Sequence, residues 1–253
     1  MAKTFGLFVF LLVLAIPTAK EGRDRWVIWN VGQGQWVTLI REDSCWHFDM
    51  GGEWAPWARI RSECRRKFNS LQLSHYDWDH MNFVSRAGGD LPNLCHFPWP
   101  AGEVSPTKKR RLSRIPKCFI SPPFLVWHPG LAKTSNAMSA VSLFAGLLLP
   151  GDSPAGAEKQ WAMKRLGWVP SAAMTAPPLN SARWLILGHH GSRTSTSELL
   201  LGRLPKLVGS ISSARRRRYG HPHLQTQMRL HRHRIPLLRT EDWGNIVIEM
   251  GPE

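Results

Sequence analysis

The ten residues 71–80, LQLSHYDWDH, constrain the fold more than any other part of this chain. Side chains that can bind metals follow directly after a short apolar run: His75, Asp77, Asp79 and His80. If residues 71–73 form a buried strand, alternation places the first three of these on a common side, and His80 turns in from the next helix. Mixed nitrogen and oxygen ligands suit Zn²⁺, Mn²⁺ or Fe, and such clusters often hold two ions. The segment predicts a metal site at a strand end, rather than a loop rich in His and Asp by chance.

The composition allows one substantial core and favours a polyanionic partner. The chain has 253 residues, of which 43% are hydrophobic. Its 33 Lys and Arg against 18 Asp and Glu give a formal net charge of +15. Such a surplus favours nucleic acid or anionic lipid through long-range attraction and counterion release, although a merely solvated basic surface has the same composition.

The first 19 residues read as a separate unit. Lys3 precedes an unbroken apolar run at residues 5–16, and the small residue Ala19 would serve as a cleavage edge. The run is too short for an ordinary spanning helix and is typical of a secretory signal peptide, with an uncleaved membrane anchor as the alternative. Residues 20–253 would then be an exported domain, periplasmic or extracellular.

The four cysteines have no Cys-x-x-Cys spacing, so a zinc knuckle is not indicated. In an exported chain they could form two disulfides in any of three connectivities, or remain buried thiols. They are Cys45, Cys64, Cys95 and Cys118.

Apolar runs that read as strands recur along the rest of the chain. Strands are expected at residues 26–31, 36–40, 45–48, 71–73, 124–127, 139–149, 183–187, 207–210 and 245–249, and helices at 54–68, 158–166, 197–204 and from after His223 to about His231. A basic, Pro-rich stretch at about 88–123 is expected to be a surface insertion or loop region that contains one short helix. His or Asp beside Gly follows several strand ends, at Asp49, His75, Asp152, His189 and His221. If these ends converge, they build one polynuclear metal site.

The order of four motifs resembles the metallo-β-lactamase superfamily: DMGG at 49–52, SHYDWDH at 74–80, GD at 151–152 and GHHGS at 188–192. Three further motifs resemble, more narrowly, the metallo-β-lactamase-like domain of ComEC-type DNA-uptake proteins: NVGQG at 30–34, YGHP at 219–222 and RTEDWG at 239–244. The resemblance spans roughly residues 26–249. It implies an α/β fold, a four-layer αββα sandwich with a metal site on one edge.

The resemblance also implies roles for single residues. Two divalent ions, Zn²⁺ or Mn²⁺, would be held by His75 and Asp77 on one side and by Asp79, His80 and His189 on the other, with Asp152 bridging both. Asp49 would orient the cluster. Asp79 would also accept a proton from the attacking water, and His190, Ser192 and His221 would face the substrate phosphate.

The chain departs from the family pattern at two places that matter. The superfamily's isolated histidine has no clear equivalent, and His128 is the only well-placed candidate. Gln35 stands where the family usually has Asp, so a supporting contact is expected to be lost.

The implied function is that of a metal-dependent phosphodiesterase or nuclease acting on DNA in uptake or competence, through a bridging water polarised to hydroxide. Basic side chains would track the DNA backbone without reading bases: Arg193, Arg215, Arg216, Arg217 and Arg218, with residues 108–111. DNA and a membrane DNA-uptake channel are the expected partners of a monomer. Two alternatives stay open. They are a metallo-hydrolase of a small ester or amide, such as a β-lactam or lactone, and a non-catalytic DNA-binding module.

Overall fold

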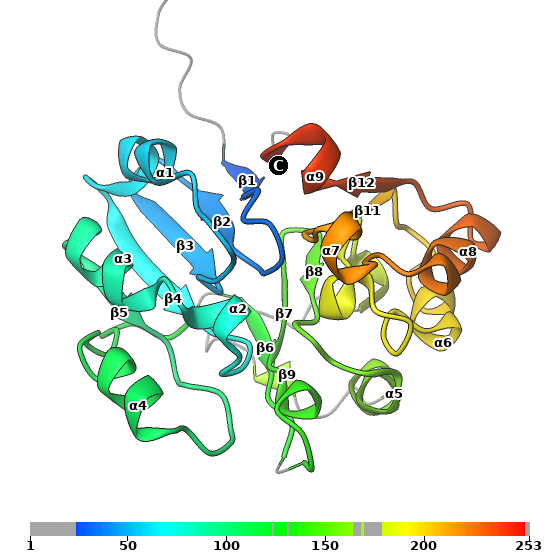
Figure 1. Ribbon diagram of the computed structural model, residues 1–253, viewed down its shortest axis with the longest axis horizontal. Coiled ribbons are helices and arrows are strands. Elements are labelled where there is room, and N and C mark those ends of the chain that lie inside the picture. Colours follow the sequence, from blue (N-terminus) through cyan, green and yellow to red (C-terminus); the bar gives the residue numbers. More distant parts are fainter. Residues whose placement is uncertain (1–23, 123, 131, 164–167, 170–178, 251–253) are drawn as a thin grey trace, which may run out of the picture.

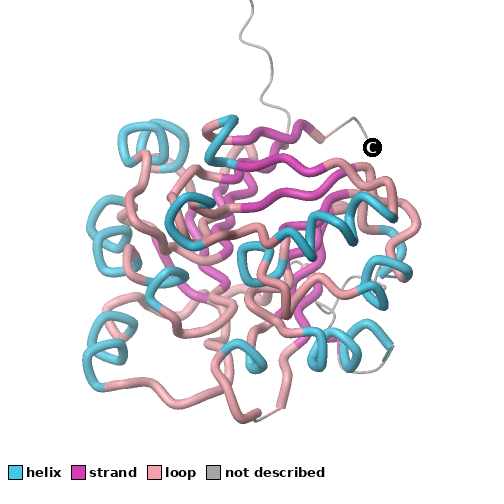
Figure 2. The backbone as a smooth tube through the Cα atoms, turned by 45° about the vertical axis from the view of Figure 1, so that its right-hand side comes forward, coloured by secondary structure: helices cyan, strands magenta, loops and turns pink. Residues whose placement is uncertain are grey.

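Two β-sheets lie face to face at the centre of the computed structural model, which describes residues 24–250 except 123, 131, 164–167 and 170–178 (Figure 1). Helices cover the outer face of each sheet, and the turned view in Figure 2 shows the same layers. Within the described residues one sheet has six strands and the other seven. The predicted four-layer αββα sandwich is confirmed.

The first sheet carries the N-terminal half of the site. Its strand order is β13-β1-β2-β3-β4-β5. The strands are β1 (Arg25–Ile28), β2 (Val37–Ile40), β3 (Ser44–Phe48), β4 (Phe68–Gln72), β5 (Leu94–His96) and β13 (Ile246–Glu249). Its covering helices are α1 (Trp57–Cys64), α2 (Trp78–Met81), α3 (Val84–Asp90) and α4 (Pro106–Leu112). Strand alternation divides β1 between two cores, since Trp26 and Ile28 pack between the sheets while Val27 packs under the helices.

The second sheet has the order β12-β11-β10-β8-β7-β6-β9. Its strands are β6 (Leu125–Trp127), β7 (Val141–Phe144), β8 (Leu147–Leu149), β9 (Trp168–Val169), β10 (Trp184–Ile186), β11 (Gly209–Ser212) and β12 (Leu237–Arg239). The helices that lie between and after its strands along the chain are α5 (Ala155–Met163), α6 (Glu198–Gly202), α7 (Arg216–Tyr219), α8 (Leu224–Arg232) and α9 (Thr240–Trp243). Short 3₁₀ turns lie at Asn136–Met138, Leu179–Ser181 and Gly188–Gly191.

Several segments differ from the sequence-based expectation. Residues 139–149 form a hairpin and not one strand, because Ala145 and Gly146 adopt φ values of 45° and 75°, as a tight turn between twisted strands requires. Residues 88–123 contain the expected short helix, α4, but they also supply β5, which forms the edge of the first sheet and was not expected. Strands β9 and β12 were not predicted.

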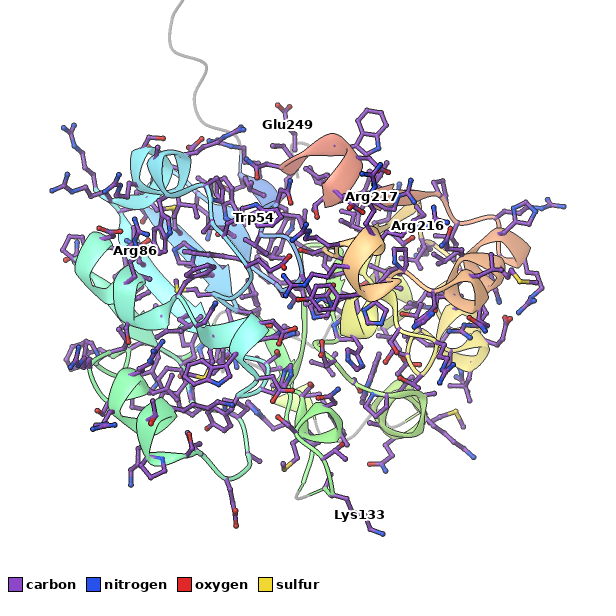
Figure 3. The ribbon with its side chains drawn as sticks, viewed as in Figure 1. Trp54, Arg86, Lys133, Arg216, Arg217 and Glu249 are labelled. Atoms are coloured by element: carbon purple, nitrogen blue, oxygen red, sulfur yellow. A yellow bond between two sulfur atoms is a disulfide. The ribbon has the colours of Figure 1, made fainter. Side chains whose placement is uncertain are left out.

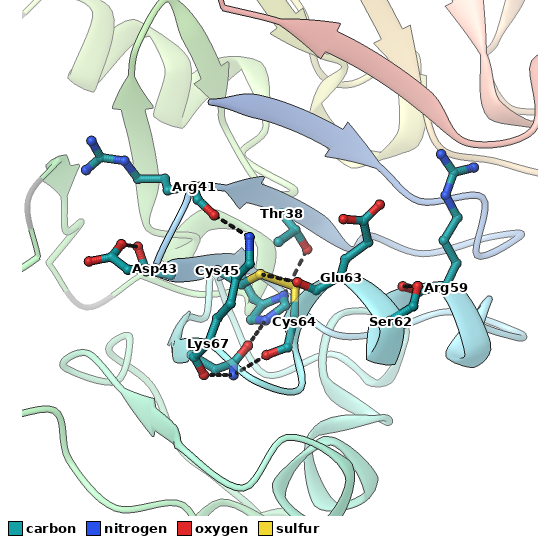
Figure 4. Close-up of a disulfide and its surroundings, with 12 residues drawn as sticks. Thr38, Arg41, Asp43, Cys45, Arg59, Ser62, Glu63, Cys64 and Lys67 are labelled. Atoms are coloured by element: carbon teal, nitrogen blue, oxygen red, sulfur yellow. Dashed lines mark hydrogen bonds between the residues drawn. A yellow bond between two sulfur atoms is a disulfide. The ribbon is translucent and has the colours of Figure 1, made fainter. Parts of the chain in front are cut away.

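The cysteines form two disulfides, Cys45–Cys64 and Cys95–Cys118. The first joins β3 to the end of α1 (Figure 4), and the second closes the loop that carries α4. The predicted signal peptide or anchor lies outside the described residues. Among the residues that are described, no helix is long and apolar enough to cross a membrane.

Candidate metal centre

Side chains from four strand ends of the two sheets meet in one cluster of imidazoles and carboxylates. Asp49 follows β3, the segment 74–80 follows β4, Asp152 follows β8, and His189 and His190 follow β10. Two groups of three have ligand atoms within 4.8 Å of one another: His75, His80 and Asp152, and Asp79, His80 and His190. Residues that are far apart in sequence are therefore brought together as the strand-end pattern predicts.

Asp152 lies at the centre of this cluster, and its two oxygens face different imidazoles. Oδ1 lies 3.0 Å from Nε2 of His80 and 3.8 Å from Nε2 of His190. Oδ2 lies 3.8 Å from Nε2 of His75 and 3.6 Å from Nε2 of His189. A carboxylate whose two oxygens face different pairs of imidazoles can bridge two ions.

Backbone packing brings Asp152 this close. Gly151 adopts φ +55°, and a Cβ on it would lie 2.8 Å from the Cβ of Ser74 and 3.0 Å from that of Ser139. Only glycine allows the loop after β8 to approach the loop after β4 so closely. The Gly-Asp pair is therefore a steric requirement of the site.

The loop after β4 presents two further carboxylates at its open side. Oδ2 of Asp77 lies 3.5 Å from Nε2 of His75, and Oδ2 of Asp79 lies 3.1 Å from Nε2 of His190. Their side chains are 40% and 37% exposed, whereas that of Asp152 is only 4% exposed. A substrate can reach the cluster from the side of Asp77 and Asp79.

Hydrogen bonds fix the orientation of the imidazoles. Nδ1 of His80 donates to Oδ2 of Asp49 at 2.6 Å, and Nδ1 of His190 donates to the carbonyl oxygen of Ser213 at 3.0 Å. Protons held on Nδ1 leave both Nε2 lone pairs directed into the cluster, as metal ligands require. Asp49 occupies the predicted orienting position. Its Oδ2 also accepts a bond from Nε2 of Gln35 at 2.9 Å, so the contact expected to be lost is present.

The residues fit divalent ions. Nε2 of His75 and Oδ1 of Asp152 are buried without a hydrogen-bond partner, and the 3.0 Å approach of His80 to that oxygen lacks hydrogen-bond geometry. Ligand atoms that share an ion at about 2.1 Å lie roughly 3–3.5 Å apart, close to the spacing seen here. Burial disfavours the charge of Asp152, yet the imidazoles of His80 and His190 hold its pKa well below the usual value. The cluster thus offers an anionic carboxylate beside imidazole nitrogens, which divalent ions would bind in place of protons.

His189 and His190 occupy positions that differ from the expectation. Both adopt left-handed backbone conformations, with φ 48° and 56°, a strained geometry that concentrates at functional sites. His190, which was expected to face substrate, lies beside Asp79 and His80. His189, which was expected beside Asp79 and His80, instead lies near Oδ2 of Asp152, the oxygen that also faces His75.

The other predicted catalytic residues lie at different distances from the cluster. Oγ of Ser192 bonds Oγ1 of Thr194 at 3.0 Å within its own turn. The ring of His221 lies 5.8 Å from that of His189, and its Nδ1 is 3.2 Å from Nε2 of Gln33. Desolvation lowers the pKa of His221 to about 4. Gln33 was missed by the sequence analysis, although its place in the NVGQG motif was a signal.

His128 remains apart from this arrangement. It is half-buried after β6, and burial lowers its pKa. Among the described residues no contact joins it to the cluster.

The basic residues near the site are not equivalent. Glu53 pairs with Arg215 at 3.1 Å and with Arg218 at 2.7 Å, so these two brace α7 against the loop after β3. Within the described chain, Arg216 and Arg217 form no ion pair, and Figure 3 labels both beside α7. Two of the four arginines are therefore available to a ligand.

The two-sheet sandwich of this chain matches the metallo-β-lactamase fold. A metallo-β-lactamase fold protein from Bacillus subtilis, YhfI, superposes with a TM-score of 0.54 and 11% sequence identity over 89% of this chain and 99% of that one. Among curated proteins, the chain is 27% identical to Recombination protein 2 of Haemophilus influenzae over 96% of its own length and 31% of the relative's. It is also 27% identical to Competence protein ComA of Neisseria gonorrhoeae, over 94% and 33% of the two lengths. The chain thus spans about a third of these relatives.

No family model matches the chain. The resemblance to the metallo-β-lactamase superfamily and to ComEC-type competence proteins is confirmed by the fold and these relatives.

Proposed function

We propose that this chain is a metal-dependent phosphodiesterase that cleaves DNA with two divalent ions, Zn²⁺ or Mn²⁺. The observation that carries the proposal is the division of the Asp152 oxygens, one toward His80 and His190 and the other toward His75 and His189. When bound in such a pair, divalent ions activate water and neutralise the charge that develops on phosphorus.

The proposed ligand sets follow from the distances. The first ion would be held by His75, Asp77 and His189, and the second by Asp79, His80 and His190, with Asp152 shared between them. In this assignment His189 takes the place of the superfamily's isolated histidine. Two adjacent histidines would then serve different ions, which their left-handed backbone conformations make possible.

Metal stoichiometry separates His189 from His128. His189→Ala should lower the bound metal from two ions to one per chain, because the first ion loses a ligand. His128→Ala, its matched control, should keep two. Inductively coupled plasma mass spectrometry on dialysed protein measures both. The reverse pattern would return the isolated-histidine role to His128.

We propose that His221 contacts a bound phosphate. The backbone N–H of Arg215 donates to Oε1 of Gln33 at 3.4 Å, which orients the amide so that its NH₂ group faces Nδ1 of His221. With Nδ1 accepting, the proton of the neutral imidazole lies on Nε2. His221 would donate this proton in a hydrogen bond to a phosphate oxygen, while the carboxylate of Asp79 accepts the proton of the attacking water.

The DNA substrate is supported by charge and by the relatives. Arg193, Arg216 and Arg217 are exposed, and α4 adds the exposed Lys109 and Arg110. Unpaired cations of this kind bind phosphates of any sequence. The relatives' names refer to recombination and competence.

The two disulfides are typical of an oxidising compartment. We therefore place the protein outside the cytosol, exported or anchored by residues 5–16. There it would act as a monomer that receives DNA at a membrane uptake channel.

A nuclease assay tests the function. The chain is stripped of metal and then supplied with Mn²⁺ or Zn²⁺. We expect DNA cleavage with at least one ion, its loss in His75→Ala, and a lower affinity with a weaker salt dependence in the double variant Arg216→Gln/Arg217→Gln. Intact DNA with turnover of a lactone or β-lactam would favour the small-molecule alternative. A gel shift without cutting by the metal-loaded chain would favour a binding module.

A further inference from the structure

We propose that Trp78 is the stacking platform for an unpaired nucleobase next to the phosphate at the metal centre. This inference rests on the proposed action on DNA and adds a base-binding subsite to it. Trp78 is the first residue of α2, between the candidate ligands Asp77 and Asp79, and its side chain is 41% exposed. An exposed indole at this position has no role in the ligand geometry itself.

Two cations approach the Trp78 ring from α4. Nζ of Lys108 lies 5.1 Å from the ring centroid, and Cζ of Arg111 lies 4.8 Å from it. Arg111 also donates to the carbonyl oxygen of Asn82, just after α2, at 3.4 Å. The ring and the two charges therefore form one unit between α2 and α4, and its indole is adjacent in sequence to the candidate ligands Asp77 and Asp79.

This combination suits a nucleotide better than it suits other ligands. A base has an aromatic face for the indole, and its phosphates carry the charge that Lys108 and Arg111 attract. A small ester or lactam has no aromatic base to stack on the indole and at most one or two charges for the cations, and pockets for such ligands are largely apolar. The base has to be unpaired, because a paired base in a duplex keeps its faces stacked on its neighbours.

The packing of α4 supports a binding role for this unit. The helix lies in the loop closed by Cys95–Cys118, and Ser105 caps its start through a bond from the N–H of Lys108. The neighbouring Lys109 and Arg110 point to solvent. One helix thus holds two cations against the ring and offers two more to the backbone of the strand.

The experiment compares two labelled polymers on the metal-free full chain, so that cleavage does not interfere. One is a thymidine 12-mer, and the other is a 12-mer of abasic sites with the same phosphates. Fluorescence anisotropy should show the thymidine polymer binding about tenfold more tightly, as expected for a stacked base. Trp78→Ala should bring its affinity down to that of the abasic polymer, whose own affinity should stay unchanged.

Three further variants sharpen the test. Trp243→Ala is the matched control, because Trp243 is 70% exposed on α9, which lies far from α4 in Figure 1. It should change neither affinity. Trp78→Phe should keep part of the preference for the thymidine polymer. The double variant Lys108→Met/Arg111→Met should lower the affinity for both polymers equally.

If Trp78→Ala lowers the affinity for both polymers equally, or for neither, the stacking role is overturned while the DNA substrate stays in place. If the wild-type chain binds neither polymer, the proposed function fails, and the base subsite fails with it. Circular dichroism of each variant confirms that it is folded.

Discussion

Asp152→Asn should reduce the bound metal from two ions to at most one and lower phosphodiester turnover by about a thousandfold. The substitution keeps the shape of the side chain but removes the charge shared by the two imidazole pairs. Four histidines would then face two dications with only Asp77 and Asp79 to balance them. Metal ions supply several kcal/mol of charge stabilisation to such reactions, and each 1.4 kcal/mol or so is tenfold in rate.

Two measurements check this expectation, metal analysis by mass spectrometry and initial rates on a labelled oligonucleotide. The matched control is Asp242→Asn, since Asp242 is an exposed aspartate paired only with Arg239. It should keep two ions and full activity. Two tightly bound ions in Asp152→Asn would show that Asp152 does not bridge, and the ligand sets proposed above would have to be redrawn.

Most of the fold follows from local patterns. Strand β1 (RWVI) is rich in apolar and aromatic residues, and strand β3 (SCWHF) is followed directly by Asp49 of the site. The hairpin at residues 139–149 was missed because its turn uses Ala145 as well as Gly146, and alanine is rarely found at positive φ. Strand β12 was missed because it is short and begins directly after Pro236, and proline argues against a strand inside an apolar run.

The sequence predicted which residues form the site better than it predicted which of them lie next to one another. Sequence order identified Asp49, His75, Asp152 and the histidine pair, because each follows a strand end. It could not decide which of His189 and His190 lies beside Asp79, since both histidines follow the same strand end in one motif. Only their backbone angles decide which imidazole faces Asp79. Gln33 and Glu53 were missed for a similar reason, because they act through contacts with α7, far along the chain.

Acidification should destabilise the metal-free protein by about 3 kcal/mol through His47 alone. This side chain is buried in the first sheet, where Nδ1 accepts bonds from Nε1 of Trp36 and Oγ1 of Thr38, and Nε2 donates to Oδ1 of Asn69. Desolvation lowers its pKa from 6.5 to about 4. Below pH 6.5 the unfolded chain therefore takes up a proton that the folded chain refuses. Stability contributed by the neutral imidazole is complete above pH 6.5 and is lost as the pH falls toward 4.

Urea unfolding at a series of pH values between 4 and 7, in the presence of a chelator, measures this effect. His47→Gln keeps one donor and one acceptor but has no proton to gain, so its loss of stability between pH 7 and 4 should be about 3 kcal/mol smaller than that of the wild type. His231→Gln, an exposed histidine on α8, should follow the wild-type curve. If His47→Gln loses as much stability on acidification as the wild type, the neutral buried imidazole is not the group that limits acid stability.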